Sequence, residues 1–233
     1  MHTRARTFSF RFGALAILAL TLAQSRADDA NNVPTLKWPG DFLARVEIVA
    51  LLETLDAELL SHDSATLTLE HWCAAHRLAT PATVTAARAT DLDKRPSPEQ
   101  RQELHVSATE PIGYRRVKLS CGPVLLSEAD NWYVPSRLTP EMNRILETTD
   151  TPFGKVLLPL KFQRHTLSST MLWSALPEHW EMSPIPIHAH ADSLQIPESL
   201  LQHTAVLTLP DGTPISEVIE TYKSGLLRFP APH

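Results

Sequence analysis

The sequence predicts an α+β domain built on one antiparallel β-sheet. Two observations carry this prediction. Apolar residues recur at helical spacing in the first third of the chain, and afterwards they alternate with polar residues in paired runs separated by turn residues. Helices followed by hairpins favour an antiparallel sheet with helices packed on it. With 43% hydrophobic and 20% charged residues, the composition is that of a folded globular protein.

The first 27 residues are typical of a secretory signal peptide. Arginines precede an apolar run at residues 12 to 23, and small residues precede Asp28. The run is shorter than the ~20 residues that span a bilayer, which favours cleavage over a membrane anchor. We therefore expect a periplasmic or secreted protein, with residues 28 to 37 flexible and residues 38 to 233 forming a single domain.

The charge balance argues against nucleic acid as a partner. Removing residues 1 to 27 takes away four arginines and no acid, so 17 basic and 26 acidic side chains remain and the net charge is about −9. Phosphate backbones are bound by clustered lysines and arginines. We expect a small-molecule partner instead, and no stable membrane insertion after cleavage.

Three helices are expected in the domain. Apolar residues at three- and four-residue steps predict the first over residues 43 to 59, with Asp41 as its N-cap. The second begins at Asp63 or Ser64. A short third helix is expected at residues 140 to 146.

The expected strands come mostly in hairpins. Cys121-Gly122-Pro123 joins the first pair, and an Asp-Gly turn within residues 210 to 213 joins the last pair. The charged residues 91 to 101 and the Pro- and His-rich residues 174 to 199 are expected as loops. The strands are predicted at residues 84–88, 114–119, 124–134, 161–167, 205–209 and 215–222.

The chain has two cysteines, Cys73 and Cys121. In an oxidising compartment they can form one disulfide, which would contribute ~4 kcal/mol by closing a long loop. Two buried free thiols are the alternative, and the sequence does not separate the two.

No metal is expected. The run His188-Ala189-His190-Ala191-Asp192 would place three ligands on one side of a strand. It lies among prolines, however, and no second ligand cluster is obvious, which favours a solvated loop. The motifs G-x-G-x-x-G, Walker A, G-x-S-x-G and H-E-x-x-H do not occur.

Five short motifs follow one another in a characteristic order. They are Asp63-Ser64-Ala65-Thr66 with Glu70, Arg115 to Leu119, Ala129 to Pro135, Thr151-Pro152-Phe153-Gly154-Lys155, and Ile215-Ser216-Glu217-Val218. In this order they resemble the chorismate pyruvate-lyase family and the ligand-binding domains of some bacterial transcription regulators with the same fold. The resemblance runs from about residue 63 to the C-terminus.

The resemblance implies a chorismate lyase-like sheet flanked by helices, with a site for a small carboxylated, aromatic or cyclic ligand. The family eliminates pyruvate from chorismate without metal or cofactor, so none is expected here. Glu217 would be the acid/base of such a carbon–oxygen lyase. Phe153 and Gly154 would lie in a loop that presents backbone N–H groups to the ligand carboxylate, and Ala65 would line the pocket.

An arginine would hold the ligand carboxylate with its charged fork. Counting back from Pro135 favours Arg116, whereas strand parity favours Arg115, which shares a face with apolar neighbours. We prefer Arg115 and keep Arg116 as second choice. Alternation also places Glu217 on a face with Ile215 and Ile219, which suggests an inward position.

Two other functions are compatible with the same sequence. The domain could be a non-catalytic module that binds a small molecule. It could also be a structural domain whose pocket is filled by bulky side chains, for which Trp132, Tyr133 and Phe153 are the candidates.

Overall fold

The computed structural model describes residues 37 to 89, 93 to 182 and 193 to 231. The expected signal peptide, residues 28 to 36 and the run from His188 to Asp192 lie outside these residues. Within the described ranges, no helix is long and apolar enough to cross a membrane.

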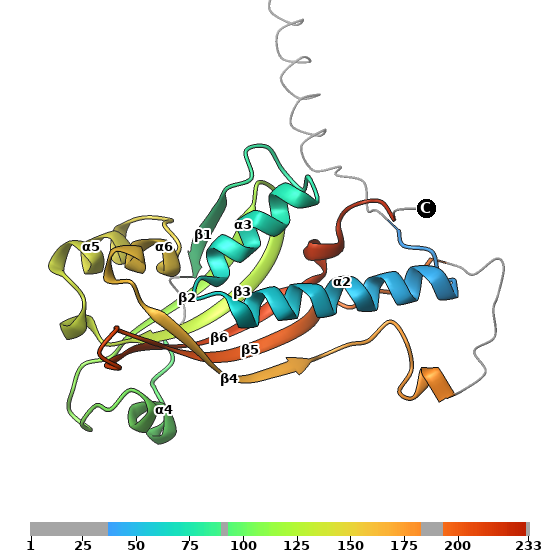
Figure 1. The fold of residues 1–233 in the computed structure, drawn as a ribbon. Helices are drawn as coiled ribbons and strands as arrows, with labels where there is room; N and C mark the ends of the chain where they lie inside the picture. The colour runs from blue at the N-terminus through green and yellow to red at the C-terminus, as the bar shows by residue number, and fades with distance from the viewer. Residues whose placement is uncertain (1–36, 90–92, 183–192, 232–233) are drawn as a thin grey trace, which may run out of the picture. The chain divides into compact units, whose positions relative to one another are not determined.

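A single antiparallel sheet of six strands lies at the centre of the domain (Figure 1). The strand order is β1-β2-β3-β6-β5-β4, and both predicted hairpins are present within it. The predicted α+β class is therefore confirmed. The strands are β1 (Val84–Ala89), β2 (Gly113–Cys121), β3 (Val124–Tyr133), β4 (Gln163–Met171), β5 (Ser199–Thr208) and β6 (Pro214–Lys223).

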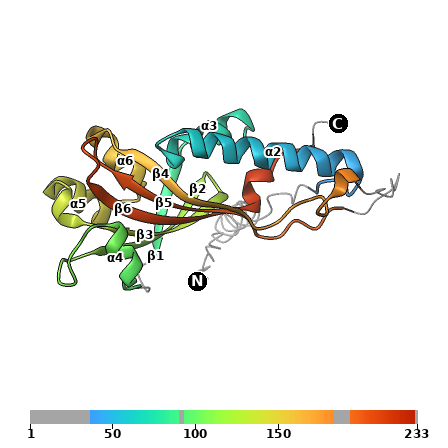
Figure 2. The same ribbon diagram turned by 60° about the horizontal axis from the view of Figure 1, so that its bottom comes forward.

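Helices cover both faces of the sheet (Figure 2). The long helix α2 (Phe42–Ser61) and α3 (Ala65–Ala75) lie on one face, which we call the α3 face, and α4 (Pro98–Glu103) lies on the other, the α4 face. The short helices α5 (Pro140–Thr148) and α6 (Phe153–Leu157) pack around the ends of β3, β5 and β6. Short 3₁₀ turns η1 to η4 lie at Pro135–Arg137, Leu158–Leu160, Trp180–Met182 and Ser224–Leu227.

Side-chain caps determine where the two main helices begin. Asp41 accepts a hydrogen bond from the backbone N–H of Ala44 (2.9 Å), and Ser64 accepts one from Leu67 (3.4 Å). These bonds satisfy backbone donors that have no partner in the first helical turn. The predicted starts of α2 and α3 are confirmed to within one or two residues.

Two segments expected as loops contain helices. Residues 91 to 101 include the start of α4, because Ser97 and Gln100 cap each other's backbone and Pro98 occupies the first helical position. The Thr-Pro-Phe-Gly segment is likewise not an open loop, since α6 begins at Phe153. Both helices are too short to show apolar periodicity.

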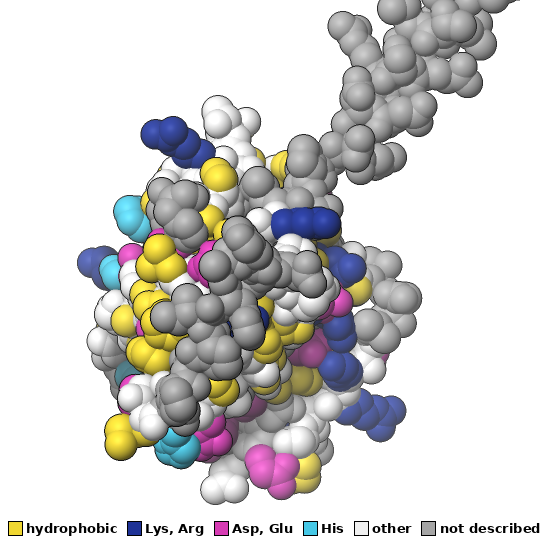
Figure 3. Space-filling view, turned by 90° about the vertical axis from the view of Figure 1, so that its right-hand side faces the viewer, with side chains coloured by type: hydrophobic (Ala, Val, Ile, Leu, Met, Phe, Trp, Pro, Cys, Tyr) yellow, Lys and Arg dark blue, Asp and Glu magenta, His cyan; other side chains and the backbone are white. Residues whose placement is uncertain are grey.

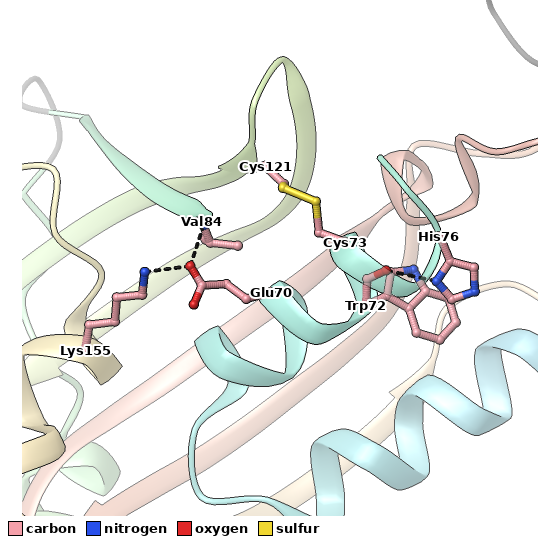
Figure 4. Close-up of a disulfide and its surroundings, with 7 residues drawn as sticks. All are labelled: Glu70, Trp72, Cys73, His76, Val84, Cys121 and Lys155. Atoms are coloured by element: carbon pink, nitrogen blue, oxygen red, sulfur yellow. Dashed lines mark hydrogen bonds and ion pairs between the residues drawn. A yellow bond between two sulfur atoms is a disulfide. The ribbon is translucent and has the colours of Figure 1, made fainter. Parts of the chain in front are cut away.

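The main core lies between the sheet and the helices α2 and α3. Leu55, Leu59 and Leu69 are fully buried there against the strands. Cys73 of α3 and Cys121 of β2 form a disulfide with a Cα–Cα separation of 6.5 Å (Figure 4). Of the two alternatives for the cysteines, a disulfide or two buried free thiols, the structure has the disulfide. The disulfide attaches α3 directly to the sheet.

The strand register assigns every side chain to one of the two faces. Arg115 of β2 lies opposite Asn131, which lies opposite Val218 and then Ala205, so these four side chains share the α3 face. In the next row, Trp132 lies opposite Glu217, and both share the α4 face. Residues adjacent in sequence can therefore belong to separate compartments.

The end of the domain at which α2 begins exposes several hydrophobic side chains (Figure 3). Leu43 at the start of α2 is 54% exposed, and Met182 of η3 is 83% exposed. Phe42 packs against Trp180 with ring centroids 5.8 Å apart, which attaches η3 to this end of the helix.

Candidate functional site

A cavity lies on the α3 face of the sheet, between the strands and the starts of α3 and α6. The empty space between its atoms, including the opening to solvent, is about 500 Å³. Within it, the volume that the centre of a water molecule can occupy is about 50 Å³. Its walls are mostly apolar, and five charged or amide side chains lie among them. The apolar wall includes Val117, Ala129, Phe153, Phe162, Leu207 and Val218; the charged and amide side chains are Asp63, Arg115, Asn131, Arg164 and Glu220.

Arg115 is the polar group with the most unsatisfied bonding capacity. Only 4% of the residue is exposed. Its Nη2 donates to the carbonyl oxygens of Thr151 (3.0 Å) and Thr149 (3.5 Å), while its Nε and Nη1 have no hydrogen-bond partner among the described residues. The segment between α5 and α6 thus holds one edge of the guanidinium and leaves its other donors free.

Arg115 forms no ion pair with a carboxylate in the described part of the chain, because its hydrogen-bond partners there are carbonyl oxygens. Burial, with a smaller contribution from the nearby Arg88, lowers the pKa of Arg115 to about 10, and Tyr133 and Asp150 oppose this only in part. The side chain stays protonated at neutral pH. It is therefore a buried cation that an anion entering the cavity would neutralise.

A second guanidinium, that of Arg164, is neutralised within the protein. Its Nη2 lies 2.7 Å from Oε2 of Glu220, and both side chains are more than nine-tenths buried. Tyr222 also donates its hydroxyl to Glu220 (3.2 Å). The Nε of Arg164 and the Oδ1 of Asn131 have no partner in the part of the chain that the structure describes. The cavity therefore offers unused donors on two sides and one unused acceptor.

The starts of α3 and α6 meet at the mouth of the cavity. A Cβ at Gly154 would lie 3.2 Å from the hydroxyl oxygens of Ser64 and Thr66, closer than side chains usually pack. Glycine at this position therefore lets the two helices approach each other. Glu70 of α3 strengthens the contact by accepting from Lys155 (2.6 Å) and from the backbone of Val84 (2.7 Å), as Figure 4 shows.

Four of the predicted residues meet at this cavity: Arg115, Phe153, Gly154 and Ala65 all line it. Arg116 does not. Its Nη2 lies 3.4 Å from Glu128 on the α4 face, because alternate residues of a strand point to opposite sides. Strand parity thus separates the two arginines in the way the sequence favoured.

The placement expected for Glu217 is wrong. It lies on the α4 face, opposite Trp132, and its Oε1 accepts a hydrogen bond from Gln100 of α4 (3.1 Å). Burial beneath α4 raises the pKa of Glu217, and the nearby Glu103 raises it further. The residue is buried as predicted, but under the helix on the other side of the sheet from Arg115. Glu217 therefore cannot act on a ligand in this cavity.

Sequence reasoning missed Arg164, Asn131 and Glu220. A signal was available for Glu220, because alternation groups it with Val218 on one face of β6. Alternation does not say which of two buried faces carries the cavity. Arg164 lies on β4, which pairs with β5 and not with the strand that carries Arg115, so only the long-range strand order brings the two guanidinium groups to one cavity.

No cluster of three or more His, Cys, Asp or Glu side chains that could hold a metal ion occurs in residues 37–89, 93–182 and 193–231. The charged and amide side chains of the cavity are Arg115, Asn131, the ion pair of Arg164 and Glu220, and Asp63, which accepts a hydrogen bond from the backbone of Arg164 (3.0 Å). The unpaired donors among them suit an anion.

Comparison with known proteins finds a curated relative and a set of fold neighbours. No family model matches the chain. The uncharacterized protein y4mC of Sinorhizobium fredii is 52% identical over 198 residues, which are 84% of this chain and 83% of that protein.

Among solved structures, the comparisons find matches of low identity. PhnF from Mycobacterium smegmatis is 13% identical with a TM-score of 0.46, covering 90% of this chain and 98% of that one. A GntR-family transcriptional regulator from Enterococcus faecalis is 13% identical with a TM-score of 0.38, covering 64% and 98%.

Proposed function

The chain belongs to the same family as y4mC of Sinorhizobium fredii, and we propose that it binds a small organic carboxylate in the cavity beside Arg115 without transforming it. One observation carries the proposal. A buried guanidinium that forms no ion pair within the described residues lines a mostly apolar hollow and has two N–H donors without a partner.

Arg115 has charged donors left for an anion. Its Nη2 is occupied by two carbonyl oxygens, which fix the orientation of the guanidinium. The free Nε and Nη1 lie on different edges of the group, each shared with Nη2, so a carboxylate would accept from one free donor at a time. Charge-assisted hydrogen bonds of this kind contribute more than neutral ones, particularly in a site shielded from water.

The walls favour a ligand that is apolar next to its carboxylate. Val117, Ala129 and Val218 come from three adjacent strands, and Phe153 and Phe162 supply aromatic surface. Apolar atoms beside the carboxylate would be buried against these side chains. Asn131 would accept a hydrogen bond from a hydroxyl or amino group on the same ligand.

Binding without catalysis is favoured over the lyase reaction by the position of the carboxyl groups. Glu217 lies on the other face of the sheet. Glu220 lines the cavity, but its carboxylate is already paired with Arg164 and accepts from Tyr222, and Asp63 accepts from the backbone of Arg164.

We also propose that the protein works outside the cytoplasm. The basic and apolar start of the chain and the Cys73–Cys121 disulfide both support export. The ligand would then be a carboxylate present in the periplasm or the surroundings of the cell.

Isothermal titration with benzoate, 4-hydroxybenzoate and chorismate tests the proposal. We expect one site per chain, and Arg115→Met should weaken binding by at least tenfold, whereas Arg116→Met on the α4 face should leave it unchanged. Pyruvate should not be released from chorismate. Binding that is equally strong in both variants, or pyruvate release abolished by Arg115→Met, would contradict the proposal.

A further inference from the structure

A second hollow, the outer groove, adjoins the cavity. It is lined by the end of α2, the first half of α3 and the segment after α6, and the centre of a water molecule can reach about 580 Å³ of it. Asp63, Ser64 and Phe162 line both hollows, so they form the wall between them. The inner cavity, with about 50 Å³ of such space, is far smaller.

Apolar and polar side chains together line the outer groove. Leu67 of α3 is 42% exposed and Leu158 of η2 is 44% exposed, although both are large hydrophobic side chains. Phe162 adds apolar surface where the groove adjoins the cavity. The polar side chains of the lining are Glu58, His62, Asp63, Ser64, Thr68, His71 and Lys161. Apolar surface that is concave and next to a binding cavity is suited to a ligand.

We infer that the ligand is an elongated amphipathic carboxylate, with its acid group at Arg115 and an apolar tail that passes Phe162 into the outer groove. The inference rests on the proposed function and adds the class of ligand. The small inner cavity can hold the acid group and a few neighbouring atoms. The rest of a longer molecule would continue into the outer groove, because the two hollows share a wall of only a few side chains.

A series of straight-chain carboxylates from acetate to decanoate tests the inference by titration calorimetry. Each methylene that enters apolar surroundings should raise the affinity about threefold to fourfold, from the ~0.8 kcal/mol gained per buried CH₂. We expect the affinity to rise with chain length and to level off once the tail fills the groove. Arg115→Met should weaken binding of every member.

Exposed leucines provide a matched pair of variants. Leu158→Asp places a charge in the outer groove and should weaken decanoate at least tenfold while leaving butanoate unchanged. Leu172→Asp is the control, because Leu172 is also 44% exposed but lines neither hollow. Since both side chains are exposed, neither variant should unfold the protein.

The outcomes separate the two proposals. Short acids that bind in an Arg115-dependent way, with no gain in affinity along the series, would overturn the extended ligand and leave the anion site standing. Equal effects of Leu158→Asp and Leu172→Asp on the affinity for decanoate would likewise overturn the extended ligand and leave the anion site standing. If no carboxylate of any length binds, or if Arg115→Met has no effect, both proposals fail together.

Discussion

Replacing Arg115 with methionine is expected to stabilise the fold while it removes binding. Methionine keeps the length and the apolar stem of the side chain and removes the charge. In the wild-type protein the residue is 4% exposed, forms no ion pair among the described residues and leaves two donors unpaired. A group kept in such an environment lowers stability, and the proposed binding function would be a reason to retain it.

The magnitude follows from the pKa. Burial lowers the pKa of Arg115 from its ordinary value to about 10, and at 1.36 kcal/mol per pKa unit the charged form costs about 3 kcal/mol in the folded protein. Loss of the hydrogen bonds to Thr149 and Thr151 offsets about 1–2 kcal/mol of this. We expect the free energy of unfolding to rise by about 1–2 kcal/mol. Because the pKa is lower in the folded protein, the free-energy cost of burying the charged guanidinium applies below pH 10. The difference in free energy of unfolding between the two proteins should therefore not change between pH 6 and 9.

Urea denaturation measured at equilibrium gives this free energy, with the slope against urea confirming that both proteins unfold in the same way. Arg116→Met is the control on the neighbouring residue. It removes a partly exposed ion pair with Glu128 and should lower the free energy of unfolding by less than about 1 kcal/mol. If Arg115→Met is instead less stable than wild type by more than 1 kcal/mol, Arg115 is a structural residue and the reasoning about an anion site fails.

Three further predictions concern the disulfide, Glu217 and export. Replacing Cys73 and Cys121 with alanine removes a cross-link across 48 residues and should lower the free energy of unfolding by about 4 kcal/mol in guanidinium denaturation; a loss below 1 kcal/mol would refute this. Glu217→Gln should raise stability at pH 7 and leave carboxylate binding intact. Burial raises the folded pKa of Glu217, so wild-type stability falls as pH rises from the unfolded value of about 4.5 through the folded pKa, and this fall should disappear in the variant; a variant that loses binding would contradict the placement of Glu217. Intact mass spectrometry of the protein secreted by its host should give the mass of residues 28 to 233 with both cysteines oxidised, whereas a mass that includes residues 1 to 27 would argue against cleavage.

Local patterns predicted most of the fold. The apolar spacing of α2 and the Asp-Gly turn between β5 and β6 act within a few residues, so they can be read without knowledge of the rest of the chain. The starts of α4 and α6 were missed because a helix of five or six residues has no periodicity to detect. A capping box at Ser97 was the available signal for α4.

The candidate site was predicted where strand parity was sufficient. Parity chose Arg115 over Arg116, because one face of β2 carries Val117 and Leu119 into the main core. Parity also predicted that Glu217 is buried, and it is. The error was to assume that a buried side chain of the sheet must line the cavity. Helices cover both faces of this sheet, so a side chain can be buried on the face that has no part in the cavity. Which helix covers which face depends on the order of all six strands, and no local pattern records that order.

Nuclear magnetic resonance of the arginine Nε–H groups tests the central claim most directly, because it observes the donor that is said to bind. The Arg115 resonance can be assigned by its absence in Arg115→Met. On titration with 4-hydroxybenzoate or octanoate, we predict that this resonance shifts saturably and that its exchange with water slows. A saturable response of other arginines with Arg115 unchanged, or no response at concentrations where calorimetry shows binding, would contradict the account.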